Sequence, residues 1–205
     1  MSNLEIGKKV CFVLTCNNDH QIVSIFQNFT NEDFYSLYKF LLSFNLVPLF
    51  YSKINKVVNE LSFSDDLRST IRLKYLKNRA MVFKRSQQLK EILIKFESQK
   101  IDIIPLKGVF LAEHVYGNSA ERVMSDIDLL IKEENINQTV DILSKMGYQP
   151  MMKYSLESLK KYSKHHISPF IKNGCRSVEP HFNLLSSSQY CKPEIDIKGV
   201  WGKKL

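Results

Sequence analysis

IIPLKGVFLAEHVYGNSAERVMSDIDLLIK, residues 103–132, is the stretch that decides the fold. A short apolar run ends at Lys107, a helical pattern follows, and the acidic triplet at 126–128 leads into the apolar run at 129–131. The stretch therefore predicts a strand, a turn into a short helix, and a second strand.

Two acids, Asp126 and Asp128, are separated by one apolar residue at the start of the second strand. A strand would place them on one face, roughly 7 Å apart along the chain. Carboxylates brought to 4 Å repel by about 4 kcal/mol at an effective dielectric near 20. A divalent cation relieves this repulsion, since Mg²⁺ takes oxygen ligands at about 2.1 Å. The pair is a predicted metal site, with a turn or helix-cap pair as the alternative.

The first 100 residues have helical patterns. Thr30, followed three residues later by Asp33, predicts a helix start, and Pro48 predicts another. The segment Lys8–Thr15 fits either a strand or a buried helix, because a short apolar run does not distinguish them.

A long helix is predicted from about residue 66 to 98, capped by Ser64 or Asp65. Its apolar residues form one stripe along the helix: Leu67, Ile71, Tyr75, Val82, Leu89, Leu93 and Phe96.

From Ile101 onward, the sequence pattern changes from long helices to short strands that alternate with helices. Strands are predicted at 102–106 and 127–132, with a helix at Val109–Tyr116 between them. Pro105 places the first strand at a sheet edge or marks its end. A further helix is predicted at Asn135–Met146, ended by Gly147, and another short one at 154–163.

A hairpin is predicted near the C-terminus. His166–Ile171 and Arg176–Phe182 have strand character, and Asn173-Gly174 joins them as a turn. Alternation would place Glu179 and His181 on one face of the second strand. The predicted order is strand, helix, strand, helix and hairpin, which forms a small mixed α/β sheet.

The ordered set around the acids resembles the signature of a family of uncharacterised bacterial nucleotidyltransferases, within the DNA polymerase beta-like nucleotidyltransferase superfamily. The matching residues are Lys107-Gly108, Tyr116, Arg122 and Asp126-Ile127-Asp128-Leu129-Leu130. Val178–Phe182 is similar to the segment that carries the family's third carboxylate, here Glu179. The resemblance covers roughly Phe34–Trp201.

The resemblance implies an α+β fold: a polymerase beta-like nucleotidyltransferase core of a small mixed sheet with helices, behind an N-terminal helical region. The predicted division is residues 1–100 for the helical region and residues 101–205 for the core. Residues 197–201 resemble the point where family members continue into a further helical region, so the core is expected to be truncated at its C-terminus.

The resemblance also implies metal-dependent transfer of a nucleoside monophosphate from an NTP to an acceptor. The acceptor stays open among a sugar, another small molecule, RNA and a protein. Asp126, Asp128 and Glu179 would hold Mg²⁺ or Mn²⁺, and Glu179 would also serve as general base toward the attacking hydroxyl.

Five further residues have expected roles at this site. Lys107 and Gly108 correspond to the turn at a helix start that receives the triphosphate. Arg122 would bind a phosphate or brace a carboxylate, and Ser125 would assist through its hydroxyl. His181 would contact substrate, order the third carboxylate, or be a packed histidine.

Charged residues are distributed unevenly along the chain, whose net charge is +8. Residues 65–100 contain ten Lys and Arg against four Asp and Glu, and Arg68, Arg72, Arg79 and Lys90 share one helix face. This basic face would bind a polyanion or be a solvated helix surface. The alternative function is therefore a catalytically inactive nucleotidyltransferase-fold scaffold or an RNA-binding module that uses the basic helix 65–100.

No run of 18 apolar residues and no signal-peptide pattern occur, so the chain is expected to be cytoplasmic and without a membrane partner. The four cysteines form no Cys-x-x-Cys pair. This pattern favours reduced thiols over a zinc site or a disulfide framework.

Overall fold

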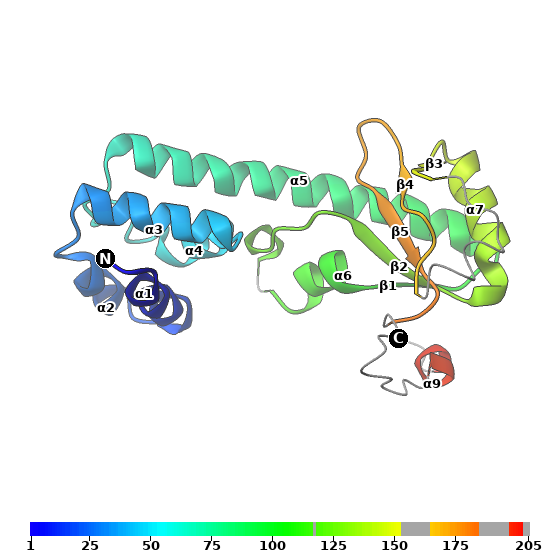
Figure 1. Ribbon diagram of the computed structural model, residues 1–205, viewed down its shortest axis with the longest axis horizontal. Helices are drawn as coiled ribbons and strands as arrows, with labels where there is room; N and C mark the ends of the chain where they lie inside the picture. Colours follow the sequence, from blue (N-terminus) through cyan, green and yellow to red (C-terminus); the bar gives the residue numbers. More distant parts are fainter. Residues whose placement is uncertain (117, 153–164, 185–196, 203–205) are drawn as a thin grey trace. The chain divides into compact units, whose positions relative to one another are not determined.

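The structure is a computed structural model (Figure 1), and it describes the following residues: 1–116, 118–152, 165–184 and 197–202. Its internal contacts divide the chain into two compact units. The first unit is Met1–Lys84 with Leu111–Met124, and the second is Arg85–Phe110 with Ser125–Leu205. The two units are groups of residues that contact one another, and such groups need not fold independently. The predicted division into a helical region, 1–100, and a core, 101–205, therefore stays a prediction.

The first unit begins with four helices: α1 (Asn3–Thr15), α2 (Asp19–Phe26), α3 (Asn31–Ser43) and α4 (Val47–Ile54). The ambiguous segment Lys8–Thr15 is part of α1 and is therefore helical. Helix starts were predicted at Thr30 and Pro48, and both are confirmed, with Thr30 as the N-cap of α3 and Pro48 in the first turn of α4.

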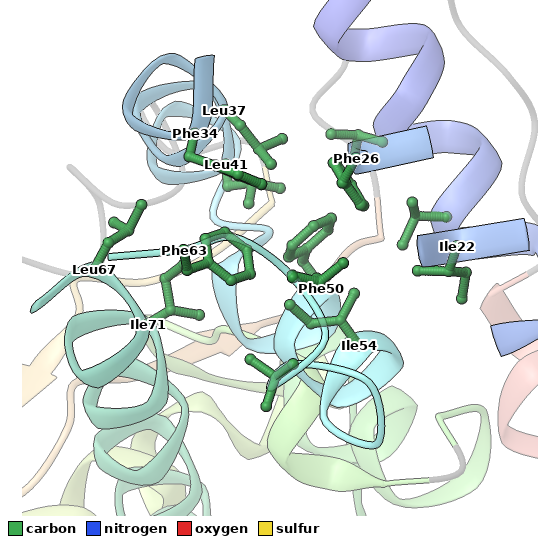
Figure 2. Packing of buried hydrophobic residues seen from close by; sticks show 14 of the residues in the cluster. Ile22, Phe26, Phe34, Leu37, Leu41, Phe50, Ile54, Phe63, Leu67 and Ile71 are labelled. Atoms are coloured by element: carbon green, nitrogen blue, oxygen red, sulfur yellow. The ribbon is translucent and has the colours of Figure 1, made fainter. Parts of the chain in front are cut away.

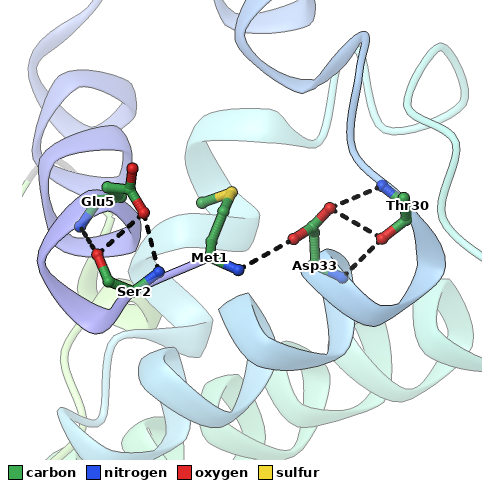
Figure 3. Close-up of polar contacts among 5 residues, drawn as sticks. All are labelled: Met1, Ser2, Glu5, Thr30 and Asp33. Carbon is green, nitrogen blue, oxygen red and sulfur yellow. Dashed lines mark hydrogen bonds and ion pairs between the residues drawn. The ribbon is translucent and has the colours of Figure 1, made fainter.

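Two of these helices begin with reciprocal capping boxes (Figure 3). Ser2 and Glu5 cap α1, and Thr30 and Asp33 cap α3. In α3, the Asp33 N–H donates to Thr30 Oγ1 at 3.2 Å, and the Thr30 N–H donates to Asp33 Oδ2 at 3.0 Å. Hydrogen bonds from Thr30 hold the pKa of Asp33 below its ordinary value. Short-range sequence signals therefore fix both helix starts.

The core of the first unit is a cluster of apolar side chains in which aromatic rings meet (Figure 2). Phe34 is fully buried, and its ring centroid lies 4.5 Å from that of Phe63 and 5.9 Å from that of Phe26. Phe26 also meets Phe50 edge to face at 6.2 Å. Ring contacts of this kind add to the stabilisation from burial.

Helix α5 (Asp65–Ser98) confirms the predicted long helix. Ser64 caps it, because its Oγ accepts the Leu67 N–H at 3.4 Å. Leu67, Ile71, Val82, Leu89 and Phe96 of the predicted stripe are buried. The stripe also contains buried polar residues that its apolar pattern omits: Asn78, Arg85 and Gln88.

The second unit is built on a mixed sheet of five strands: β1 (Ile103–Pro105), β2 (Ile127–Ile131), β3 (Gln149–Pro150), β4 (Phe170–Ile171) and β5 (Val178–His181). Their order is β1-β2-β5-β4-β3, and Figure 1 shows β2 beside β5. β2 and β5 pair in parallel, whereas the other neighbours are antiparallel. Pro105 ends the edge strand β1, as predicted.

Helices and turns connect these strands: α6 (Lys107–His114), η1 (Ser119–Glu121), η2 (Glu133–Asn135), α7 (Ile136–Lys145) and α9 (Ile197–Gly202). Gly147 follows α7 with φ of 86°, the left-handed conformation predicted for a C-terminal glycine. The helix predicted at 154–163 lies outside the described residues. The α+β fold with N-terminal helices is confirmed.

The hairpin turn is a four-residue turn in which the Cys175 N–H donates to the Lys172 carbonyl at 3.0 Å. Gly174 supplies the positive φ of 75° that the turn requires. The strand before it is shorter than predicted, since β4 begins at Phe170 and not at His166. Pro169 explains the difference, because proline has no N–H for a ladder hydrogen bond.

Within the described part of the chain, none of the helices combines the length and the apolar character needed to cross a membrane.

Candidate active site

The register between β2 and β5 positions the acidic residues. Asp128 pairs with Glu179 across the parallel ladder. The Ile127 N–H donates to the Ser177 carbonyl at 3.0 Å, one residue before Asp128 and two before Glu179. Partners in a parallel ladder direct their side chains to the same sheet face. Asp128 and Glu179 therefore lie on one face, although 51 positions separate them in the sequence.

Three side chains converge at this point. One potential ligand atom from each of Asp128, Glu179 and His181 lies within 4.8 Å of the other two, and this is the group of metal-ligating type found among the described residues. Asp128 is 5% exposed, whereas the Glu179 side chain is 26% exposed. The buried acid is thus paired with an acid that solvent or a substrate can reach.

His181 is hydrogen-bonded to the buried acid. Its Nε2 lies 2.8 Å from Asp128 Oδ1 and 3.9 Å from Glu179 Oε2. A carboxylate accepts, so Nε2 carries the proton and donates to Asp128. Of the roles expected for His181, the structure therefore shows it ordering an acid, but the acid is Asp128 and not Glu179.

Lys107, the first residue of α6, reaches the same carboxylate from just after the edge strand β1. The Leu106 N–H donates to the Asp128 carbonyl at 2.9 Å, which fixes the neighbouring lysine beside the site. Lys107 Nζ lies 3.3 Å from Asp128 Oδ1, and its side chain is 61% exposed. Gly108 follows in the first turn of α6 and is buried. The predicted helix at Val109–Tyr116 is therefore present but begins earlier and ends earlier, with the lysine and the glycine in its first turn.

The backbone at Lys107 is strained. Its φ is 43°, a left-handed conformation that disfavours residues with a side chain. Such conformations cost about 1–3 kcal/mol and often occur at functional sites. Asn45 and Lys100 also have a positive φ, and Lys107 is the one of the three whose ammonium group meets Asp128.

Opposing effects set the protonation of Asp128. Burial alone would raise the pKa of its carboxyl, but the hydrogen bond from His181 and the charge of Lys107 hold that pKa below its ordinary value. The carboxylate is consequently ionised at neutral pH, which is the form that binds cations.

Asp126 lies at the entry to β2 and outside the group of three converging side chains. Ser125 Oγ donates to Asp126 Oδ1 at 2.9 Å, so the predicted assistance from the Ser125 hydroxyl is directed at this acid. The role of Asp126 as a metal ligand stays a prediction.

Arg122 belongs to the first unit. Its guanidinium lies over the Tyr116 ring, 5.7 Å from the centroid, and Nη1 approaches the Tyr116 hydroxyl at 3.5 Å. The Arg122 carbonyl accepts from Asn78 Nδ2 at 3.1 Å. Both roles expected for Arg122, binding a phosphate or bracing a carboxylate, stay predictions.

Gln88 is a residue of the second unit that the sequence reading missed. Its Nε2 donates to the Tyr148 hydroxyl at 2.9 Å and to the Arg176 carbonyl at 2.8 Å, and its Oε1 accepts the Arg176 N–H at 3.0 Å. Burial, together with nearby Cys175, raises the pKa of Tyr148 to about 12. The signal was a polar residue on the buried stripe of an otherwise basic helix.

Of the four residues on the predicted basic face of α5, Arg68 makes hydrogen bonds within the protein. Arg68 Nη1 donates to Asp65 at 2.9 Å, and its Nη2 donates to the Leu61 and Phe63 carbonyls at 3.3 and 3.4 Å. Arg72, Arg79 and Lys90 are exposed. Arg68 is therefore engaged at the helix start, and nucleic-acid binding by the other three stays a prediction.

The converging side chains fit a divalent cation. The two carboxylates suit Mg²⁺ or Mn²⁺, and His181, whose Nε2–H donates to Asp128, orders one of them. Ligands at about 2.1 Å from one ion lie about 3–4.2 Å apart, so the observed spread of up to 4.8 Å requires only a small contraction. Lys107 and the His181 N–H already compensate the charge of Asp128 at this position.

Comparison with known proteins adds the family. Among curated proteins, none matches the chain. A family model described as "Uncharacterised nucleotidyltransferase" matches residues 30–204. That range includes α3 to α5, the whole sheet and the three converging side chains. The chain belongs to this family of uncharacterised nucleotidyltransferases.

Proposed function

We propose that the protein transfers a nucleoside monophosphate from an NTP to a hydroxyl or phosphate of an acceptor, with Mg²⁺ or Mn²⁺ held by Asp126, Asp128 and Glu179. The family assignment supports nucleotidyl transfer as the reaction class. The observation that carries the site is the parallel pairing of β2 and β5, which sets Asp128 opposite Glu179.

Asp128 and Glu179 are the central ligands in this proposal. A divalent cation held by them would neutralise the charge that develops on the transferred phosphoryl group. His181 orders Asp128 through its Nε2–H, which keeps one carboxylate oxygen fixed and leaves the other available. An acid held in this way loses little conformational freedom when a cation binds.

Glu179 has the second role of accepting a proton. Asp128 is buried and hydrogen-bonded, whereas Glu179 is partly exposed and its Oε2 lies 3.9 Å from His181 Nε2, beyond hydrogen-bond distance. A carboxylate oxygen of Glu179 is therefore the atom placed to accept the proton of an acceptor hydroxyl.

Lys107 supplies positive charge toward the phosphates. Its ammonium group is exposed on one side and paired with Asp128 on the other. A cation at Asp128 would weaken that ion pair, and the lysine would then be available to a phosphate oxygen. The strained backbone at Lys107 supports a role beyond surface solvation.

Incubation with each α-³²P-labelled NTP in Mg²⁺ or Mn²⁺ tests the reaction. Label should appear on a small molecule, an RNA or a protein together with an equal amount of pyrophosphate. Glu179→Gln should lose both signals, while Glu97→Gln, a change of an exposed acid on α5, should keep them. Absence of pyrophosphate release with every NTP and acceptor pool would contradict the proposal.

The RNA-binding alternative is favoured by one observation, the exposure of Arg72, Arg79 and Lys90 on α5. Binding through these residues predicts a log–log salt slope near −0.7 per phosphate neutralised on a single strand. Replacing all three by Gln should flatten that slope. An unchanged slope, or no binding at low salt, would return these residues to a solvated helix face.

A further inference from the structure

The first unit contains a cavity that the proposed reaction does not use. Its volume is about 390 Å³, within the range of about 300–1,000 Å³ that is typical of small-molecule sites. Its walls come from the end of α3, the start of α4, the middle of α5 and the segment that follows η1. All of the lining residues belong to the first unit. The cavity is therefore defined within one compact part of the chain.

Most of the cavity wall is apolar. Leu42, Leu73, Met81 and Val123 line it, and each of these residues keeps more than a third of its surface exposed. Exposed apolar side chains that gather at one position often mark a place where a ligand binds. The wall therefore favours an apolar group as part of the occupant.

The charged residues of the cavity wall are two lysines. Lys74 and Lys77 lie about one turn apart on α5, and both are exposed. Neither forms a hydrogen bond or an ion pair with the described part of the chain. The lining contains no aspartate or glutamate among the described residues. Charges of one sign at a cavity favour a ligand of the opposite sign, here an anion.

The start of α4 adds positive potential to the same cavity. Val47 and Pro48, the first two residues of the helix, line the cavity, and the N-cap residue Leu46 makes no side-chain cap hydrogen bond. The first N–H groups of a helix lack partners within the helix and favour a nearby negative charge. The two lysines and the helix start therefore favour the same kind of group.

A buried amide in the wall has an unused acceptor. Asn78 is 3% exposed, and its Nδ2 donates to the carbonyls of Ala120 and Arg122 at 2.6 and 3.1 Å. These bonds join α5 to the segment that carries Val123, so this side of the cavity is formed in the folded chain. Asn78 Oδ1 has no hydrogen-bond partner among the described residues. A buried acceptor without a partner is unfavourable, and a donor on a ligand would satisfy it.

We propose that this cavity binds a small organic anion whose apolar body carries an N–H or hydroxyl donor. The apolar body would contact Leu42 and Leu73, the anionic group would meet Lys74 and Lys77, and the donor would reach Asn78. The cavity shares no residue with the site at Asp128 and Glu179. The proposal therefore goes beyond nucleotidyl transfer and does not depend on it.

Indoleacetate and hydroxyphenylacetate are the probes, since each combines an aromatic body, a donor and a carboxylate. Calorimetry at low salt measures their affinity. Replacing Lys74 and Lys77 together by Met should weaken binding by about tenfold or more, the usual loss for a hydrogen bond to a charged group. Lys8→Met, which removes an exposed lysine of α1 in the same unit, should stay within about twofold of the wild type.

Saturable binding of neither probe would overturn the proposal, as would equal affinity in the double lysine variant and the wild type. Two analogues of indoleacetate extend the test without changing the protein. Skatole lacks the carboxylate, and naphthaleneacetate lacks the N–H. Both should bind more weakly than indoleacetate. Equal affinity of either analogue would overturn the proposal, because the lysines or Asn78 would then contribute nothing.

Filling the cavity tests its position. Thr70 is an exposed lining residue, so Thr70→Trp should fold normally and abolish binding of both probes. Indoleacetate should accordingly raise the melting temperature of the wild type but not that of Thr70→Trp. Full affinity in this variant would overturn the proposal.

A second copy of the chain is the other occupant to test. Sedimentation of the wild type should show no dimer that Thr70→Trp dissociates. Such a dimer would make the cavity an interface and overturn the proposal. Failure of the proposed function gives a different result, because Glu179→Gln should lose nucleotidyl transfer and keep the full affinity for indoleacetate.

Discussion

The core of the first unit and the candidate site of the second are both buried, but different interactions hold them. In the core, rings such as Phe34 and Phe63 meet without polar partners, and helices such as α1 and α3 start at local capping boxes. At the site, the hydrogen bond from His181 on β5 and the charge of Lys107 at the start of α6 oppose the effect of burial on the pKa of Asp128 and hold it below its ordinary value. An apolar core tolerates substitutions of similar volume with a small loss of stability. A buried charge does not tolerate the loss of a partner in the same way, because it needs particular groups to compensate it.

The largest expected effect is on catalysis. Asp128→Asn should lower nucleotidyl transfer at least about a thousandfold, because several kcal/mol of charge stabilisation from the bound cation would be lost. The amide keeps the shape of the side chain, so the free energy of unfolding, measured with urea, should change by much less than the activation free energy of the transfer reaction. Transfer within tenfold of the wild type would show that the comparison assigns the wrong role to this acid.

The next effect is on the apolar core. Phe34→Ala should lower the free energy of unfolding by about 3–5 kcal/mol, since it removes a fully buried ring and leaves a cavity. Urea unfolding measures this change. Mn²⁺ affinity should stay the same under conditions where the variant is folded. A loss below about 1 kcal/mol would mean that the core repacks far more easily than typical aromatic cores do.

A smaller effect is expected from the residue that orders Asp128. His181→Ala should weaken Mn²⁺ binding by about 10–100-fold, the usual cost of removing a partner that orients a ligand. Isothermal calorimetry measures the affinity, with His20→Ala in the first unit as control. Unchanged affinity would make His181 a packing residue, and complete loss of binding would make it a direct ligand.

The smallest effect concerns pH and Tyr148. Its pKa of about 12 in the folded chain exceeds the usual value near 10, so the fold favours the neutral phenol. That stabilisation is fully present below about pH 10 and is lost as pH rises toward 12. The unfolding free energy of the wild type should therefore fall relative to Tyr148→Phe across this interval. A pH-independent difference between the two proteins would contradict the raised pKa.

The sequence predicted the elements that depend on neighbouring residues. The caps at Thr30 and Ser64, the glycine after α7 and the turn at Gly174 each act within a few positions, so the sequence pattern contains the whole interaction. The two strands that carry Asp128 and Glu179 were also predicted, from an apolar run and from the Asn-Gly hairpin signal.

The partners of the acids were not predicted, because they come from distant parts of the chain. The 2.8 Å hydrogen bond between His181 and Asp128 joins two strands through a register that no local pattern fixes. Arg85 was hidden for another reason. It lies on the buried stripe of α5 but was counted among the basic residues of a helix rich in lysine and arginine.

The central claim is that β2 and β5 together build one metal site, and Mn²⁺ binding measured by electron paramagnetic resonance tests it most directly. The wild type should bind Mn²⁺, and Glu179→Gln alone should weaken that binding at least about tenfold, since one carboxylate ligand near 2.1 Å is lost. Glu97→Gln should have no effect. Equal Mn²⁺ affinity in Glu179→Gln and the wild type would contradict the claim, because β5 would then contribute nothing to the site.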